Sequence, residues 1–273
     1  MPIGVLTSNL AFLLIAGLPD EQFQSWGWRI PFLLSIFLLV VGMIVRRRLT
    51  DSPEFEQVKQ RRQVSRLPIA TLFRERPLMV TLASFAAIAP PAVGYTVMVY
   101  MLNYGTQQVG FDRTTLLLLI MLSALLWIAM IYVSARWADR FGSKRIYTIG
   151  AATGVLWAFP LFLLVDTGSV LAAGVAFLVA GVVQAIMAGA QGGLFTEIFD
   201  ARIRYSGASI AYQLGGLVGG AVTPIVATSL LGATGSSLFI ALYLAFLCAL
   251  SLVAVIVLRV PQQQADTEAT AVS

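Results

Sequence analysis

The stretch TTLLLLIMLSALLWIAMIYVSARWADRFGSKR, Thr114–Arg145, decides the fold of this chain. Its first 22 residues, Thr114–Ala135, carry no charge, and four Lys and Arg residues follow within Arg136–Arg145. A helix needs about 20 predominantly apolar residues to cross the hydrocarbon core of a bilayer. The stretch therefore predicts a membrane-spanning helix that ends in a basic loop.

The same alternation of apolar runs and basic blocks continues along the rest of the 273 residues. Only 11% of the residues are charged and 58% are hydrophobic, whereas soluble domains carry about 25% charged residues. We therefore expect an all-α integral membrane protein with about eight transmembrane helices. The expected spans are residues 2–18, 28–45, 78–101, 115–135, 146–165, 170–193, 207–231 and 237–258.

The positive charges predict the orientation of these spans. Of the 18 Lys and Arg residues, 16 fall in four blocks, and two expected spans lie between each block and the next. The blocks are Arg46–Arg76, Arg136–Arg145, Arg202 with Arg204, and Arg259. Short loops rich in Lys and Arg stay in the cytoplasm. Both termini are therefore expected to be cytoplasmic.

The residue inventory excludes several classes of function. The chain has no histidine, which removes Ser-His-Asp and Cys-His catalysis and histidine-ligated zinc or haem. A single cysteine, Cys248, rules out an internal disulfide framework. The net charge of +5 lies in membrane-flanking loops, so we expect no nucleic-acid partner. We also expect no enzyme activity, no cofactor and no metal site.

The first loop motif is WADRFGSKR at Trp137–Arg145. Gly142 can adopt a left-handed turn, and Asp139 can pair with a neighbouring cation or cap a helix N-terminus. The motif therefore predicts a tight cytoplasmic turn of two to three residues that latches two helices. Its proposed gate residues are Asp139, Arg140, Gly142, Lys144 and Arg145. The alternative is a basic hairpin with no specific role.

Two further motifs accompany it. The first is WGWRIPF at Trp26–Phe32, followed by SPEF at Ser52–Phe55. The second is EIFDARIRYSG at Glu197–Gly207, leading into YQLGG at Tyr212–Gly216. Its proposed loop residues are Glu197, Arg202 and Arg204.

Taken in order, these motifs resemble the metabolite:proton symporter family of the major facilitator superfamily, which includes transporters of proline and betaine, α-ketoglutarate, citrate and shikimate. The resemblance covers nearly the whole chain. Some positions depart from the family pattern: Ala135 stands where a leading Gly is common, Ser143 replaces a cation, and Asp200-Ala201 replaces a Pro-Thr pair.

The resemblance implies part of a 12-helix fold, with this chain looking like an N-terminally truncated copy that covers helices five to twelve. Residues 1–45 would then be the last two helices of the N-terminal half and 46–77 the cytoplasmic loop between halves. Residues 78–260 would be the six-helix C-terminal half, and 261–273 a disordered tail.

The resemblance also implies a function. The implied function is alternating-access symport of a small organic acid or zwitterion with protons in a bacterial inner membrane. The partners would be the lipid bilayer, a solute and a proton. The alternative is a truncated membrane remnant or assembly partner that does not transport.

The interior of the spans contains no Asp, Glu, Lys or Arg, so the site candidates are uncharged. Pro90 and Pro91 are expected to kink the third span near its middle. Gln184 and Gln191 are seven residues apart and share one helix face. The proposed cavity residues are Tyr95, Gln184, Gln191, Tyr212 and Gln213. For each of them, an interhelical hydrogen bond that only holds the bundle together is the alternative.

Two later spans carry packing signals. Gly215, Gly216, Gly219 and Gly220 give the seventh span small residues on one face, which predicts close approach of a neighbouring helix. The last span, Leu238–Leu258, is apolar all round and is expected at the lipid-facing periphery.

Overall fold

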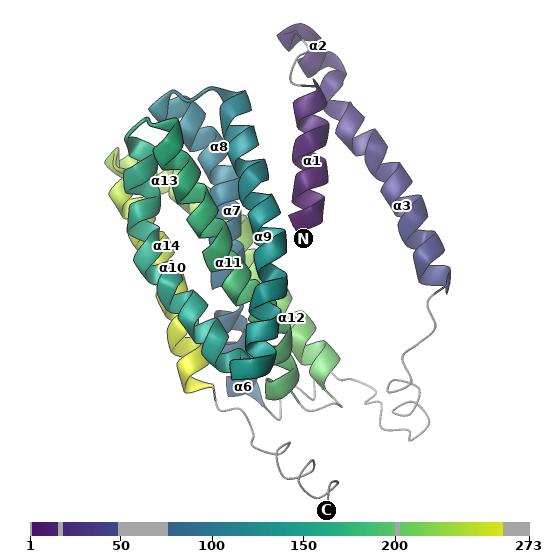
Figure 1. The fold of residues 1–273 in the computed structure, drawn as a ribbon, viewed down its shortest axis with the longest axis vertical. Coiled ribbons are helices and arrows are strands. Elements are labelled where there is room, and N and C mark those ends of the chain that lie inside the picture. Colours follow the sequence, from purple (N-terminus) through teal and green to yellow (C-terminus); the bar gives the residue numbers. More distant parts are fainter. Residues whose placement is uncertain (1, 16–18, 49–75, 200–202, 259–273) are drawn as a thin grey trace, which may run out of the picture.

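The chain forms a helical bundle with a separate helical hairpin beside it (Figure 1). The computed structural model describes residues 2–15, 19–48, 76–199 and 203–258, and every regular element among them is helical. The hairpin comprises α1 (Pro2–Ile15), α2 (Asp20–Ser25) and α3 (Ile30–Arg48). The bundle comprises α6 (Pro77–Ala86), α7 (Ala89–Tyr95), α8 (Met101–Tyr104), α9 (Arg113–Phe141), α10 (Ser143–Asp166), α11 (Val170–Ile198), α12 (Arg204–Gly216), α13 (Thr223–Thr234) and α14 (Ser237–Val257).

Three π-helical turns link the shorter helices of the bundle. They are η2 (Thr96–Tyr100), η3 (Gly105–Val109) and η4 (Leu217–Val222). As a result, α6 to η3 form one interrupted membrane-length helix, and α12, η4 and α13 form another. A π-helical turn widens the helix by one residue and is frequent at functional sites.

Seven stretches of the described residues are long and apolar enough to cross a membrane. They are Gly27–Val45, Pro77–Val109, Arg113–Phe141, Ser143–Asp166, Val170–Ile198, Arg204–Thr234 and Ser237–Val257. The all-α membrane fold is therefore confirmed. The first expected span, 2–18, is described only as the 14 residues of α1, since residues 16–18 lie outside the described part.

The observed helices run beyond several predicted ends. The third span was expected to stop at residue 101, but it remains helical to Val109 and ends at Gly110, where φ is +86°. The fourth was expected to stop at 135 and continues to Phe141. Polar residues at the aqueous end of a helix do not terminate it; a glycine with positive φ does.

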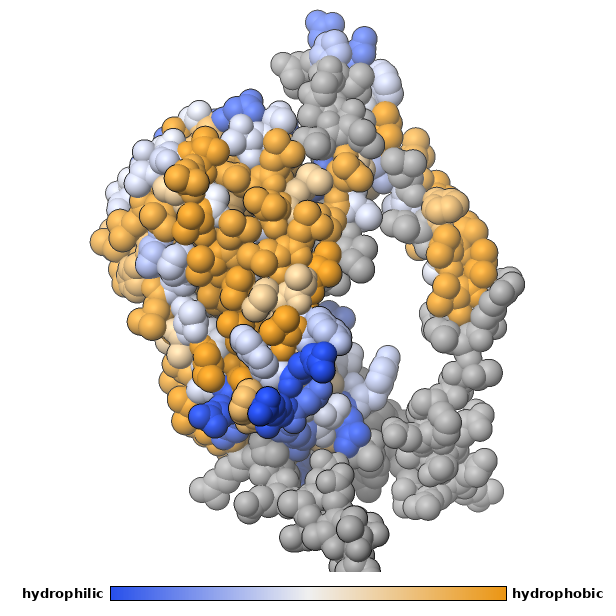
Figure 2. All heavy atoms as spheres, in the orientation of Figure 1, coloured by the Kyte–Doolittle hydropathy of each residue, from blue (hydrophilic) through white to orange (hydrophobic). Residues whose placement is uncertain are grey.

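Apolar side chains cover the middle of the bundle and polar ones gather at its two ends (Figure 2). The strongest hydrophilic patch lies at the lower end, where α9 ends and α10 begins. The charged side chains there include the exposed Arg136, Asp139, Arg140 and Arg145. An apolar belt between two polar ends is the surface that a bilayer requires of a multi-pass protein.

The hairpin touches the bundle through α1, which lies alongside α9. At its upper end, the Arg113 guanidinium lies 5.8 Å from the Phe23 ring centroid. Helix α3 instead leans away from the bundle, and large apolar side chains such as Phe37 (71% exposed) and Leu39 (67% exposed) are uncovered. This helix therefore presents an apolar surface to lipid or to other helices.

The last helix is less peripheral than its composition predicts. One face of α14 packs against α10, α6 and α7, and Leu244, Cys248 and Ser251 on that face are buried. The opposite face is exposed at Phe246 and Ile256. Uniform hydropathy does not reveal which side of a membrane helix is covered, because lipid and protein neighbours are equally apolar.

The predicted loop at 46–77 and the predicted tail at 261–273 fall mostly on residues that the structure does not describe. Residues 49–75 and 259–273, which include the SPEF motif and the predicted disordered tail, lie outside the described part.

Candidate functional site

The centre of the bundle contains an interrupted helix. α6 ends at Ala86 and α7 begins at Ala89, with Pro90 and Pro91 in its first turn. The prolines have no N–H to donate to the carbonyls of Ala86 and Ala87, the partners that a continuous helix would supply. In a membrane, backbone groups freed in this way must find partners within the protein.

Ser251 of α14 bridges the interruption. Its Oγ accepts a hydrogen bond from the Ala89 N–H at 2.9 Å and donates one to the Phe85 carbonyl at 2.7 Å. In an uninterrupted helix, the Ala89 N–H would bond the Phe85 carbonyl directly. The serine hydroxyl is therefore inserted between the two groups, which is a recognised cause of helix bending.

Two other helices donate further hydrogen bonds to the interrupted segment. The Tyr147 hydroxyl, on α10, donates to the Ala86 carbonyl that Pro90 leaves without a partner. The Gln184 Nε2, on α11, donates to the Pro90 carbonyl at 3.2 Å. Both side chains are buried, and Tyr147 is completely enclosed. The interruption is thus held by side chains from three separate helices.

Glycines of the seventh predicted span make direct contact with the interrupted backbone. A Cβ added at Gly219 would collide with the Ile88 carbonyl and lie 3.1 Å from the Ala92 nitrogen. A Cβ at Gly215 would come within 2.6 Å of the Ala87 carbonyl oxygen. Because these glycines have no side chain, α12 and η4 can pack directly on the interruption, as the glycine spacing predicts.

The two predicted glutamines lie on one face of α11 and are buried. Gln184 contacts the broken helix as described above. Gln191 is 4% exposed, and its Nε2 has no hydrogen-bond partner in the described part of the chain. Among the described residues, the buried Gln191 amide therefore has no hydrogen-bond acceptor, whereas the Gln184 amide donates to the Pro90 carbonyl. A role in solute contact stays a prediction for both residues.

The other predicted cavity residues lie at the surface of the bundle. Tyr95 is 39% exposed, and its ring lies over Gly220. Tyr212 is 47% exposed and packs edge-on against Phe195, one turn from Gln191, with ring centroids 5.1 Å apart. Gln213 is exposed. Their helices α7, α11 and α12 are mutual neighbours, so the structure brings the five candidates onto adjoining elements.

The motif at Trp137–Arg145 forms a turn of one residue rather than the expected two or three. α9 includes Asp139 and Arg140 and is followed by Gly142, whose φ is +92°. Asp139 is exposed and forms no ion pair among the described residues, and no side chain caps the N-terminus of α10. The capping role expected of Asp139 is therefore wrong. Arg140 lies over the adjacent Phe141 ring, at 5.3 Å from its centroid.

Lys144 makes the connection that was expected of Asp139. Its Nζ donates to the Leu258 carbonyl at 2.6 Å and to the Ile256 carbonyl at 3.2 Å, at the C-terminus of α14. A cation at a helix C-terminus is favourable because the last carbonyls lack partners and carry partial negative charge. The motif thus fastens the start of α10 to the end of α14. Arg145 is exposed.

The third motif is only partly described. Arg204 Nε donates to the Phe199 carbonyl at 3.2 Å, which ties the start of α12 to the end of α11. Glu197 is partly exposed in the last turn of α11. Arg202 lies outside the described residues.

The sequence did not reveal several residues that hold the helices together, among them Tyr147, Ser251 and Asp166. Asp166 accepts hydrogen bonds from Tyr104 Oη at 2.6 Å and from Ser237 Oγ at 2.5 Å, joining α10, α8 and α14. A signal existed for Ser251, the single serine inside an otherwise apolar helix, because such a hydroxyl usually bonds across helices. Nothing in the sequence distinguishes Tyr147 from the other tyrosines.

This arrangement defines a multi-pass membrane protein with an interrupted helix, α6 and α7, whose two parts are held by hydrogen bonds from neighbouring helices. The family profile described as Major Facilitator Superfamily matches residues 4–216 of the chain. The chain therefore belongs to the Major Facilitator Superfamily.

Named relatives agree with the family resemblance of the motifs. The chain is 32% identical to the inner membrane metabolite transport protein YhjE of Escherichia coli (strain K12), over 96% of this chain and 61% of that protein. It is 33% identical to the shikimate transporter of the same organism, over 95% and 60%. It is 28% identical to a putative proline/betaine transporter of Staphylococcus aureus (strain MSSA476), over 89% and 54%. The chain thus spans about three fifths of the length of the first two relatives.

Proposed function

We propose that this chain is a secondary transporter that moves a small organic acid or zwitterion by alternating access. The observation that carries the proposal is the interrupted helix at Ala87–Ile88, with the unpartnered amide of Gln191 on the neighbouring α11. Discontinuous helices near the bilayer midplane form solute sites in many transporters. The names of the relatives, which concern metabolites, shikimate and proline or betaine, support the same class of solute.

We infer that the transporter lies in a bacterial inner membrane with the Lys- and Arg-rich ends in the cytoplasm. In the described helices, charged residues lie within the first or last two turns. A proton relay through the membrane normally uses a buried carboxylate. Proton coupling therefore rests on the family resemblance, and the carboxylate would have to come from outside the described spans.

Uptake by cells that produce this chain tests the proposal. Radiolabelled shikimate and betaine are supplied as probes, with and without a protonophore, to cells producing the wild-type chain or Gln191→Ala. Gln22→Ala, which changes an exposed glutamine of α2, is the matched control. We expect protonophore-sensitive accumulation of one probe and at least tenfold less with Gln191→Ala.

The same assay distinguishes a transporter from the alternative, a membrane protein that does not transport. Membrane insertion and folding are checked by detergent extraction and size-exclusion chromatography. A folded, inserted chain that accumulates neither probe would favour a membrane protein that does not transport. Accumulation that is unchanged by Gln191→Ala would remove Gln191 from the solute site.

A further inference from the structure

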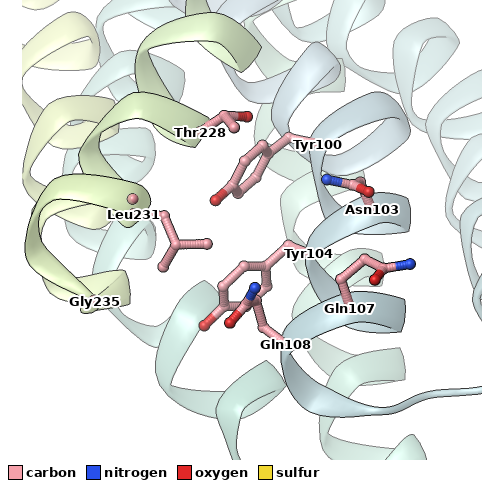
Figure 3. A pocket seen from close by; sticks show the side chains of 9 residues that line it. Tyr100, Asn103, Tyr104, Gln107, Gln108, Thr228, Leu231 and Gly235 are labelled. Atoms are coloured by element: carbon pink, nitrogen blue, oxygen red, sulfur yellow. The ribbon is translucent and has the colours of Figure 1, made fainter.

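A pocket with uncharged polar walls lies between α8 with η3 on one side and α13 on the other (Figure 3). Its volume is about 250 Å³. Tyr100 and Tyr104 project toward α13, and Thr228 and Leu231 face them from that helix. The pocket lies near the upper ends of the helices, more than two turns from the interruption at Ala87–Ile88.

One wall of the pocket contains a buried hydroxyl that the described residues leave without a hydrogen-bond partner. Tyr100 is 3% exposed, and its Oη has no hydrogen-bond partner in the described part of the chain. In Figure 3 this hydroxyl points into the space between the two helices. A buried hydroxyl without a partner is unfavourable, so an occupant that bonds to it would gain affinity.

The adjacent tyrosine is fixed by its own hydrogen bond. Tyr104 Oη donates to Asp166 Oδ1 at 2.6 Å, while Asp166 Oδ2 accepts from Ser237. The rings of Tyr100 and Tyr104 are stacked, with centroids 5.7 Å apart and an interplanar angle of 22°. The Tyr100 hydroxyl is therefore presented from a wall that α10 and α14 hold in position.

The chemistry of the walls limits the class of ligand. The lining contains tyrosine and threonine hydroxyls and the carboxamides of Asn103, Gln107 and Gln108, but no ionisable Lys, Arg, Asp or Glu side chain. Hydroxyls and carboxamides both donate and accept hydrogen bonds. An ionic solute would lose hydration here without gaining an opposite charge. Leu231 adds an apolar surface, and Gly232 leaves space.

We propose that this pocket binds a small, electrically neutral, polyhydroxylated solute. Its volume lies just below the roughly 300–1,000 Å³ of pockets for drug-sized ligands, which suits a molecule of cyclitol or monosaccharide size. The site is separate from the interrupted helix and from Gln191. Binding at this site requires no transport, so the inference stands independently of the proposed function.

Binding of myo-inositol to the purified full chain in lipid nanodiscs tests this site. Saturation-transfer NMR gives the affinity, and the melting temperature reports folding. Gly232→Leu should abolish binding, because a Cβ at Gly232 meets no atom within 4 Å and the added side chain can fill the pocket. Tyr100→Phe should weaken binding about three- to tenfold through loss of one hydrogen bond.

The control is Tyr243→Phe on α14, where the hydroxyl has no hydrogen bond among the described residues. It should bind myo-inositol as the wild type does. Tyr100→Phe should also keep or raise the melting temperature of the ligand-free chain, since it removes a buried hydroxyl without a partner. If Gly232→Leu does not fold, Tyr100→Phe alone tests whether the pocket binds myo-inositol.

Three results would overturn the site. The first is no wild-type binding of myo-inositol at millimolar concentration. The second is binding that Tyr100→Phe leaves unchanged. The third is equal displacement of the probe by benzoate, because an anion should not enter uncharged walls. None of these readouts depends on uptake of shikimate or betaine.

Discussion

Ser251 shows what one hydroxyl contributes inside this bundle. It is fully buried and completes the hydrogen bonding of both Ala89 and Phe85 across the helix interruption. Ser251→Ala would leave a backbone N–H without its partner in an apolar interior. We expect a loss of about 1–3 kcal/mol in the free energy of unfolding. Thermal unfolding of the purified chain in detergent measures it.

The matched control for Ser251 is Ser229→Ala on α13. The Ser229 hydroxyl is exposed and bonds only the Ile225 carbonyl of its own helix, at 3.0 Å. Its loss should change the melting temperature little. Equal melting temperatures for Ser251→Ala and Ser229→Ala would mean that the bridge contributes nothing to stability.

At the scale of helices, the close approach of η4 to the interruption depends on Gly219. An added methyl group would collide with the Ile88 carbonyl, which belongs to a backbone that three other side chains hold in place. Gly219→Ala should therefore destabilise the chain by about 1–3 kcal/mol. The yield of monodisperse protein and its melting temperature check this prediction.

Gly216 provides the contrasting glycine in the same segment. A Cβ there meets no atom within 4 Å, and alanine is a better helix former by about 1 kcal/mol. Gly216→Ala should keep or raise the melting temperature. If both alanine variants are equally stable, the contact between η4 and the break is not tight.

The sequence predicts the helices well and their hydrogen-bond partners poorly. Charge-free runs locate the spans because the bilayer imposes their length and composition. Pro90 and Pro91 mark the position of the interruption, since proline removes donors wherever it lies. The side chains that bond to the interrupted segment come from α10, α11 and α14, and contacts between distant segments leave no local pattern. The alternative reading of Gln184, an interhelical bond, matches its contact with Pro90.

The motif at Trp137–Arg145 shows the same limit. Its spacing identifies a turn, and Gly142 adopts the positive φ expected of it. The motif contains several charged residues, and its sequence predicts that Asp139 holds two helices together. Lys144 forms it instead, because the C-terminus of α14 lies beside the start of α10, which only the three-dimensional structure reveals.

For the whole molecule, the distribution of charge predicts which end faces the cytoplasm. The described helices alternate in direction, so the ends of α9 and α11 and the starts of α10 and α12 lie at one end of the bundle (Figure 1). That end carries the Arg136–Arg145 block, whereas the opposite end carries Arg113. The positive-inside rule places the basic end in the cytoplasm.

Cysteine labelling in spheroplasts tests this orientation. The native Cys248 is fully buried, so the wild-type chain should remain unlabelled by a membrane-impermeant maleimide. Thr114→Cys and Arg145→Cys introduce exposed thiols at opposite ends of the bundle. We expect Thr114→Cys to react in intact spheroplasts and Arg145→Cys to react only after permeabilisation. The reverse pattern would invert the topology, and labelling of both variants in intact spheroplasts would mean that the chain inserts in both orientations.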